Sequence, residues 1–346
     1  WRGGQNQVLL TAKGMAARGH QVVLACQRGG VLEGRARAAG LDVRPLSFRG
    51  DLWPRAALGL ARLLRDVAAD AAQVHDPHAL SAGVLARALG ARAALVATRR
   101  VDFPLKGGLS RAKYRRAARV IAVSRAIADV LQSGGLRDDA LRVVHEGVPD
   151  RAPQPGGRDV LRGLGLPPDA LVVGNVAALT DHKDHETLLQ AAAAVVARVP
   201  AARFVIVGEG ELRAPLEARA RALGVQDRCV FAGFRTDLDR LIPAFDVFCL
   251  SSHMEGLGTS LLDAMAFGRA IVATRAGGIP EAVADGVTGR VVAARDAASL
   301  AGALVDVLQD EATRAAYGAA GRRRFLEHFT SDLMVERTLG VLREVA

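Results

Sequence analysis

Two carboxylates stand eight positions apart in the stretch SSHMEGLGTSLLDAMAFG, residues 251–268, on either side of a glycine-containing turn. Glu255 comes just before Gly256 and Gly258, and Asp263 falls in the apolar segment that follows. A carboxylate accepts two hydrogen bonds at once, so this pair is suited to holding the hydroxyl groups of sugars. One acid would hold the ribose of a nucleotide and the other a sugar that is to be transferred.

The same turn offers main-chain nitrogens to an anion. The apolar run 246–250 predicts a buried strand, and a helix is expected to begin near Thr259. The amides of Gly258, Thr259 and Ser260 would then be free in the first helical turn, where a phosphate binds well. Gly256 and Gly258 allow the backbone to approach a ligand closely. Spacing alone leaves a simpler interpretation open, in which this is an ordinary helix start whose acid favours the helix dipole.

Short apolar runs alternate with segments of helical periodicity along the whole chain. Strands are expected at 22–26, 43–46, 93–97, 120–123, 143–145, 171–176, 203–207, 228–231, 246–250, 270–273 and 289–292. Helices are expected near 6–18, 55–69, 79–88, 109–118, 124–132, 185–197, 211–223, 259–267, 297–308, 311–327 and 332–344. This alternation predicts the α/β class, with parallel sheets covered by helices on both faces.

The segment PDRAPQPGGR, residues 149–158, interrupts the alternation and predicts a linker, because it holds three prolines and two glycines. We therefore expect two Rossmann-like doubly wound domains, at 1–150 and 158–328, facing each other across a cleft that their strand-end loops line. The first strand of the first domain would lie upstream of Trp1. A closing helix at 329–346 has the option of crossing back to the first domain.

Composition favours a soluble cytoplasmic protein. Half of the 346 residues are hydrophobic, yet no run of 18 apolar residues is uninterrupted. The three cysteines, Cys26, Cys229 and Cys249, stand singly in apolar runs, which is typical of reduced core thiols and not of disulfides or a zinc site. The net charge of +10 is concentrated in residues 1–157, which carry +13, so the first half is expected to be attracted to phosphate-rich surfaces. A bias toward arginine throughout the chain is the alternative explanation.

The run SSHMEGLGTSLLDAMAFGRAIVATRAGGIPEAV, which begins at Ser251, resembles the signature of the family 4 glycosyltransferases, which are retaining enzymes of the GT-B fold. The family pattern is a glutamate, seven residues and a second glutamate. Glu255 and Asp263 keep that spacing, although Asp263 is one methylene shorter than the usual residue. The later Gly277–Gly278–Ile279–Pro280–Glu281 also matches the family. The resemblance covers nearly the whole chain and is most specific over residues 171–292.

Further residues of the second half correspond to donor-binding positions in the family. Leu179–Lys183 resembles the loop that carries an arginine and a lysine for the diphosphate, and the resemblance assigns the lysine to Lys183. The usual arginine position holds Ala178, which departs from the family. Phe231–Arg235, with Gly233 and Phe234 at its centre, resembles the loop that cradles the nucleobase.

In the first half, the resemblance implies residues that approach the donor from the acceptor domain. The segment 1–5, with Gly3 and Gly4, resembles the glycine loop near the donor phosphates; a plain helix-entry turn is the alternative. The segment 74–78 resembles the strand-end histidine motif, and the resemblance implies that His75 touches the transferred sugar. A purely structural histidine is the alternative. His78 would support His75 without contacting the sugar.

Residues 99–125 hold nine basic residues and one acid, interleaved with apolar ones. The basic residues are Arg99, Arg100, Lys106, Arg111, Lys113, Arg115, Arg116, Arg119 and Arg125. The stretch is a candidate for peripheral contact with anionic lipid at the inner face of a membrane, or for binding an acceptor phosphate. A solvated basic face is the simpler interpretation.

The function implied is transfer of a sugar, with retention, from a nucleotide diphosphate to an acceptor hydroxyl, such as that of a lipid-linked or cell-envelope saccharide. Glu255 and His75 would act at the sugar and the remaining residues would hold the donor. The resemblance implies front-face substitution, in which the departing phosphate helps to take the acceptor proton. No D-x-D motif ends a strand, so no metal or other cofactor is expected. A GT-B nucleotide-sugar epimerase is the alternative enzyme.

A basic nucleic-acid-binding protein is the alternative from another class. It is disfavoured because only 4% of residues are aromatic and no groove-reading module is present. A nicotinamide dehydrogenase is disfavoured because no G-x-G-x-x-G opens a helix with an acid about 20 residues later.

Overall fold

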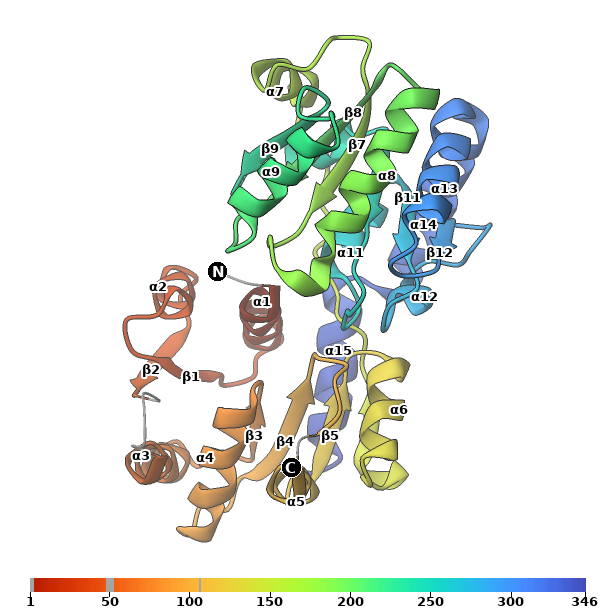
Figure 1. Ribbon diagram of the computed structural model, residues 1–346. Coiled ribbons are helices and arrows are strands. Elements are labelled where there is room, and N and C mark those ends of the chain that lie inside the picture. Colours follow the sequence, from red (N-terminus) through yellow and green to blue (C-terminus); the bar gives the residue numbers. More distant parts are fainter. Residues whose placement is uncertain (1–2, 48–52, 106) are drawn as a thin grey trace. The chain divides into compact units, whose positions relative to one another are not determined.

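The computed structural model describes residues 3–47, 53–105 and 107–346, with the backbone alone at Trp53. The chain forms two compact units: the first contains Trp1–Val148 and Thr330–Ala346, and the second contains Pro149–Phe329. Helices and strands carry the labels of Figure 1. Among the residues described, no helix has both the length and the apolar character that crossing a membrane requires.

A six-stranded parallel sheet forms the centre of the second unit, in the order β12-β11-β10-β7-β8-β9. Its strands are β7 (Leu171–Val176), β8 (Ala202–Val207), β9 (Cys229–Gly233), β10 (Val247–Leu250), β11 (Ala270–Thr274) and β12 (Gly289–Val292). The chain runs outward from β7 to β9 and then returns past β7 to form β10. The order therefore reverses between β7 and β10, and ligands bind at such a switch point in open α/β sheets.

Helices cover both faces of this sheet. They are α7 (Gly157–Gly163), α8 (His185–Arg198), α9 (Arg213–Ala222), α10 (Leu238–Leu241), α11 (Thr259–Ala266), α12 (Ile279–Ala282), α13 (Ala297–Gln309) and α14 (Glu311–His328), with 3-10 turns η2 (Asp181–Lys183) and η3 (Ile242–Ala244). In β10, Val247 and Cys249 belong to the core formed with α8, α9 and α13. Phe248 and Leu250 point to the other face and are equally buried. A strand buried on both faces is an uninterrupted apolar run, as the sequence shows here.

The first unit contains two groups of parallel strands. Strands β3 (Ala71–Val74), β4 (Ala94–Arg99), β5 (Arg119–Ala122) and β6 (Leu141–Val143) form one sheet in that order, and β1 (Val23–Gln27) pairs with β2 (Asp42–Leu46). The helices are α1 (Gly3–Ala17), α2 (Val31–Ala38), α3 (Trp53–Asp66), α4 (Pro77–Ala88), α5 (Gly107–Arg115) and α6 (Arg125–Ser133), with the 3-10 turn η1 (Asp138–Ala140).

The last helix, α15 (Ser331–Arg343), belongs to the first unit although it ends the chain (Figure 1). Met334, Val335 and Leu339 on this helix pack with Met15 of α1 and Val96 of β4. Contact with α1 is close: a Cβ at Gly14 would lie 2.5 Å from Cγ2 of Val335. Glycine at this position of α1 therefore lets the two helices approach.

The parallel sheets with alternating helices confirm the predicted α/β class. Four local details differ from the predictions. Neither α2 nor β3 was predicted, β6 begins two residues earlier than expected, and α7 begins inside the predicted linker. The reason at α7 is tertiary: the helix packs against α10, and a Cβ at Gly157 would lie 2.2 Å from the carbonyl oxygen of Arg240. Contacts that distant cannot be inferred from the local excess of proline and glycine.

Candidate active site

Lys183 and Glu255 form an ion pair at the carboxyl end of the second unit's sheet. Lys183 ends η2, which follows β7, and Glu255 lies in the turn that follows β10. Because β7 and β10 are neighbouring parallel strands, their loops leave the sheet side by side. Nζ of Lys183 contacts Oε2 of Glu255, and the two side chains are only 17% and 12% exposed. Charges this far removed from water are tolerated because each compensates the other.

Hydrogen bonds between the two loops hold this pair in place. Oγ of Ser251 donates to the carbonyl oxygen of Lys183 at 3.0 Å, and Oγ of Ser252 donates to Oε2 of Glu255 at 3.2 Å. Asp184, directly after Lys183, has a left-handed backbone with φ 49° and caps α8 with its carboxylate. Non-glycine residues seldom adopt that conformation, and those that do are often found in functional loops.

The N-terminus of α11 is the predicted anion site. Gly258 adopts φ 87° and ψ 69°, a left-handed conformation that favours glycine, and α11 begins at the next residue. Within the described part of the chain, the amides of Thr259 and Ser260 donate to no carbonyl oxygen. Gly256 accepts a hydrogen bond from the amide of Gly278 at 3.2 Å, which ties the turn to the glycine pair after β11. The turn is therefore held by its bond to Gly278, while the amides of Thr259 and Ser260 can donate to a ligand.

Asp263 is already paired with a cation. Oδ1 of Asp263 accepts from Nη2 of Arg151 at 2.5 Å, and Nη1 of Arg151 lies 2.7 Å from Oδ1 of Asp239 on α10. Burial raises the pKa of Asp263 to about 6, Arg151 opposes that rise, and the negative charge of Asp239 adds to it. Oδ2 of Asp263 has no partner among the described residues, so one oxygen is left to accept a hydroxyl.

Gly233 ends β9 at the same edge of the sheet, and Phe234 follows it. Gly233 has φ 68°, and its carbonyl oxygen accepts from the amide of Gly208 at 2.9 Å, which closes the turns after β8 and β9 against each other. A Cβ at Gly208 would lie 1.9 Å from the carbonyl oxygen of Ala177, so this approach requires glycine. The side chain of Phe234 is 57% exposed. An exposed aromatic ring above a fixed backbone turn is suited to stacking on a flat base.

In the first unit, His75 stands at the end of β3 and contacts a cation. Nη1 of Arg100 lies 3.0 Å from Nδ1 of His75, and Nε of Arg100 donates to Oε1 of Glu146 at 2.8 Å. Burial, with Arg100 as the second cause, lowers the pKa of His75 well below its usual value. A Cβ at Gly4 would lie 3.6 Å from Cδ of Arg100, so the start of α1 belongs to the same neighbourhood.

The structure places the predicted site residues in two groups, one in each unit. Gly3, Gly4 and His75 lie in the first unit, and all the others lie in the second. Gly3 and Gly4 form the first turn of α1, which corrects the predicted loop before a helix at residue 6. The preceding Trp1 and Arg2 are outside the described residues. Ala178, at the family's arginine position, is exposed and brings no charge.

The basic stretch 99–125 is only partly a surface. Arg99 is buried, donates to the hydroxyl of Tyr114 at 3.3 Å and lies over the ring of Phe103. Arg100 faces His75, and Arg119 pairs with Glu344 at 2.9 Å. Lys106 lies outside the described residues. Arg99 and Arg100 therefore do not contribute to the expected basic face.

Two family models match the chain. The model described as glycosyl transferases group 1 matches residues 159–324, and the one described as glycosyltransferase family 4 matches residues 1–151. Their boundary coincides closely with the division between the two units. The chain belongs to glycosyltransferase family 4.

Relatives of this family 4 chain include a lipopolysaccharide core biosynthesis glycosyltransferase, LpsE of Rhizobium meliloti, which is 32% identical over 52% of this chain and 52% of its own. A D-inositol 3-phosphate glycosyltransferase of Mycobacterium ulcerans is 35% identical over 54% of this chain and 41% of its own. The chain thus spans about half the length of the curated relatives it matches. Among solved structures, Anabaena HepE, crystallised with UDP and glucose, has a TM-score of 0.86 at 22% identity, covering 99% of this chain and 96% of its own.

Sequence analysis of this family 4 chain missed Arg100, Glu146 and Arg151 as site residues. Arg100 was counted only as part of a basic stretch, and Arg151 as part of a linker. Arg100 and Glu146 share one signal, a charged residue shortly after a strand: Arg100 directly follows β4, and Glu146 follows β6 after Val144 and His145. Arg151 offers no such signal, because its partners lie 88 and 112 positions further along the chain.

Proposed function

We propose that the protein is a retaining glycosyltransferase that moves a sugar from a nucleotide diphosphate to an acceptor hydroxyl. The observation that carries this proposal is the arrangement of Lys183, Glu255 and the free amides of α11 at the switch point of one sheet. A cation and main-chain donors suit a diphosphate, and the carboxylate beside them suits sugar hydroxyls. The solved relative that holds UDP and glucose supports this choice of donor.

The residues divide the work in the following way. The bond from the anomeric carbon to the diphosphate oxygen breaks, and negative charge grows on the departing diphosphate. Lys183 and the amides at Thr259 and Ser260 stabilise that charge. The acceptor oxygen forms the new bond on the same face of the sugar, and its proton passes to an oxygen of the departing phosphate. Glu255 orients the sugar by accepting hydrogen bonds from its hydroxyls, once Lys183 has turned to the diphosphate.

We further propose that this transfer needs no metal ion. Lys183 and the α11 amides supply the positive charge that a divalent cation provides in other phosphate sites. The measurement is transfer in the presence of a chelator, with activity expected to be unchanged. Loss of activity on chelation, with recovery on addition of Mn²⁺, would contradict the proposal.

The decisive experiment is a screen of nucleotide sugars by thermal shift, followed by product analysis with the donor that binds. We expect a glycosylated acceptor and a free nucleoside diphosphate, whereas an altered nucleotide sugar without any acceptor product would favour the epimerase. Glu255→Ala should abolish transfer, because the sugar loses the group that orients it. Transfer at the wild-type rate by this variant would contradict the role assigned to Glu255.

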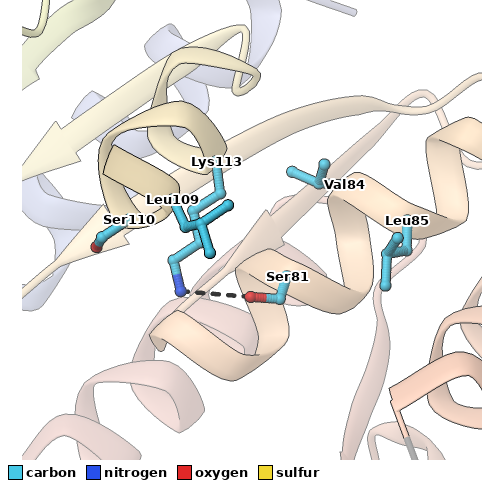
Figure 2. A pocket seen from close by; sticks show the side chains of 6 residues that line it. All are labelled: Ser81, Val84, Leu85, Leu109, Ser110 and Lys113. Atoms are coloured by element: carbon cyan, nitrogen blue, oxygen red, sulfur yellow. Dashed lines mark hydrogen bonds between the residues drawn. The ribbon is translucent and has the colours of Figure 1, made fainter. Parts of the chain in front are cut away.

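The acceptor is proposed to be a lipid-linked or cell-envelope saccharide that is reached at an anionic membrane surface. Relatives named for lipopolysaccharide core biosynthesis and for phosphatidylinositol monomannoside mannosylation support this class of acceptor. In the first unit, an open groove lies between α4 and α5, lined by Ser81, Val84, Leu85, Leu109, Ser110 and Lys113 (Figure 2). Leu109 is 90% exposed and Leu85 is 42% exposed.

Helix α5 also carries basic residues outside the groove lining. Arg111 and Arg115 are exposed on the same helix as Leu109. Lys113 donates to Oγ of Ser81 at 3.3 Å (Figure 2) and to the carbonyl oxygen of Pro77 at 2.8 Å, which fixes α5 against α4. An exposed apolar side chain that can enter the lipid boundary, on a helix that also carries basic residues, is a feature of peripheral binding to anionic lipid.

Sedimentation with vesicles tests this surface. Binding should be stronger to phosphatidylglycerol with phosphatidylcholine than to phosphatidylcholine alone, and should weaken as salt is added. Leu109→Asp should lower the affinity at least about tenfold, since burial of a leucine is worth roughly 1.5–3 kcal/mol. Leu326→Asp is the matched control, because Leu326 is 44% exposed in the second unit. Equal binding by both variants would exclude this surface.

A further inference from the structure

Arg100 determines which nitrogen of His75 carries a proton. The two side chains meet through Nη1 of Arg100 and Nδ1 of His75, 3.0 Å apart. A guanidinium has only N–H donors, so the bond exists only if Nδ1 of His75 is unprotonated and accepts. A neutral imidazole has one proton, and it must then be on Nε2.

Arg100 is itself fixed by the carboxylate on its far side. Nε of Arg100 donates to Oε1 of Glu146 at 2.8 Å, and these side chains are 15% and 8% exposed. The three residues come from the ends of different strands, β3, β4 and β6, so the sheet sets their spacing. Charge-assisted bonds of this kind are the stronger ones in proteins, and their low exposure limits competition from water.

We propose that Arg100 and Glu146 are positioning residues that hold His75 as the neutral Nε2–H tautomer, so that His75 acts on the transferred sugar as a hydrogen-bond donor and never as a base. The assignment of the tautomer depends only on the first unit. The action on the sugar rests on the proposed glycosyl transfer. Nδ1 of His75 is already engaged by Arg100, and Nε2 carries the proton. The ring therefore has no site at which to take the proton of the acceptor.

The charged groups around His75 agree with this assignment. Asp76, its neighbour in sequence, is occupied at the start of α4, where its carboxylate accepts from the amides of His78 and Ala79 at 2.8 Å each. Glu146 bonds to Arg100, so the cation and not the acid faces the imidazole. Protonation of Nδ1 would place a second donor against the guanidinium, which explains why Arg100 contributes to the lowered pKa of His75.

Nitrogen NMR of the full chain with ¹⁵N-labelled histidine tests the tautomer without any substrate. The chain has eight histidines, and the spectrum of His75→Gln identifies the signals of His75. We expect a bare, acceptor-type Nδ1 and a protonated Nε2 that do not change across neutral pH. In Arg100→Met, or in Arg100→Gln if the former does not fold, the same ring should titrate closer to the ordinary histidine pKa of about 6.5, because the neighbouring positive charge is gone. A protonated Nδ1 in the wild type, or a wild-type ring that titrates near neutrality, would overturn the proposal.

Two variants of His75 test the donor. The amide nitrogen of a glutamine reaches the position of Nε2, whereas that of an asparagine reaches only the position of Nδ1. His75→Gln should therefore keep transfer within about tenfold of wild type, and His75→Asn should lose about a hundredfold, the usual range for one lost donor at a reacting oxygen. Equal losses in the two variants would overturn the donor role. If the wild type transfers no sugar, the proposed function fails while the NMR result on the tautomer stands.

Discussion

The two units balance their charges in opposite ways. In the second unit, two acids that would repel a diphosphate are each neutralised: Glu255 by Lys183 and Asp263 by Arg151. Under the proposed function, the Lys183–Glu255 pair has to be rearranged when the donor binds, because these residues cannot serve a phosphate and a sugar while they bind each other, whereas the Arg151–Asp263 pair can persist. The second unit is thus stabilised in the absence of ligand by ion pairs, and the proposed donor would have to replace the one between Lys183 and Glu255.

In the first unit the cation faces a neutral ring. Arg100 contacts Nδ1 of His75 on one side and Glu146 on the other, so its charge is balanced without involving Nε2 of His75. This arrangement needs no exchange of partners when a sugar approaches. Preorganisation therefore concerns the protonation state of His75 in the first unit and charge compensation in the second, and substitutions should affect the two units differently.

Removal of Lys183 should have the largest effect. Lys183→Ala takes away the cation for the departing diphosphate and leaves Glu255 as a partly buried, unpaired acid, which costs both catalysis and stability. We expect kcat to fall by about 10²–10³. Steady-state kinetics and thermal melting measure the two effects. Arg219→Met is the control, because Arg219 pairs with Glu186 at 2.6 Å on the outer helices. An unchanged kcat would mean that the diphosphate does not lie beside Lys183.

Arg151→Met should weaken donor binding and leave kcat nearly unchanged. Arg151 holds Asp263 by a bond of 2.5 Å and also lies over the ring of Phe267, 5.8 Å from its centre. Without it, Asp263 loses its orientation, and we expect the donor KM to rise about tenfold, or roughly 1.4 kcal/mol. Arg322→Met is the matched control, because Arg322 pairs at 2.7 Å with Asp150, the residue directly before Arg151. A fall in kcat without a change in KM would place Arg151 in the chemical step instead.

Local patterns predicted the positions of the strand-end loops of the second unit well, because each is a strand end followed by a helix start. The turn around Gly258, the loop of Lys183 and the end of β9 all lie where alternation placed them. The site residues that were not predicted depend on contacts between distant segments. Arg151 and Asp263 are 112 positions apart, and nothing near Arg151 indicates that its partner is an acid on α11.

The burial of Arg99 and Arg100 could not be predicted from the sequence either. Arg99 and Arg100 stand together in a basic stretch, where charge alone predicts a solvated face. Arg99 is 4% exposed because β4, whose last residue it is, lies inside the sheet and its guanidinium finds Tyr114 and the carbonyl of Phe103. The sheet order that fixes this depends on the pairing of whole strands, which the periodicity of a single strand does not specify.

Donor binding should depend on pH through Asp263. Its pKa of about 6 is raised from the ordinary value near 4 chiefly by burial, so the carboxyl becomes protonated as pH falls through 6. The protonated acid loses the charge-assisted bond to Arg151 and accepts hydroxyls less well. Affinity for the nucleotide sugar, measured by calorimetry, should therefore fall a few-fold from about pH 7.5 to 5.5. In Asp263→Asn, an affinity that no longer changes with pH would confirm that Asp263 causes the dependence. If the pH dependence persisted in this variant, another group would be its cause.

The same group links stability to pH with the opposite trend. The folded state holds the proton of Asp263 more tightly than the unfolded state does, so its contribution to the free energy of unfolding falls as pH rises from about 4 to 6. It stays low at higher pH. Binding and stability thus respond to Asp263 in opposite directions, which separates its local effect from general acid unfolding.

Asp239→Asn should have the smallest effect, a shift in the pH midpoint of donor binding. The direction of that shift is the sharpest test of the charge balance in the second unit. Asp239 raises the pKa of Asp263 while Arg151 lowers it. Removing the charge of Asp239 should therefore shift the pH midpoint of donor binding below 6, whereas Arg151→Met should shift it upward. Both shifts are measurable in the same titration series. If the two substitutions moved the midpoint in the same direction, loss of packing around Arg151 would explain both, and the charge balance argued for the second unit would be wrong.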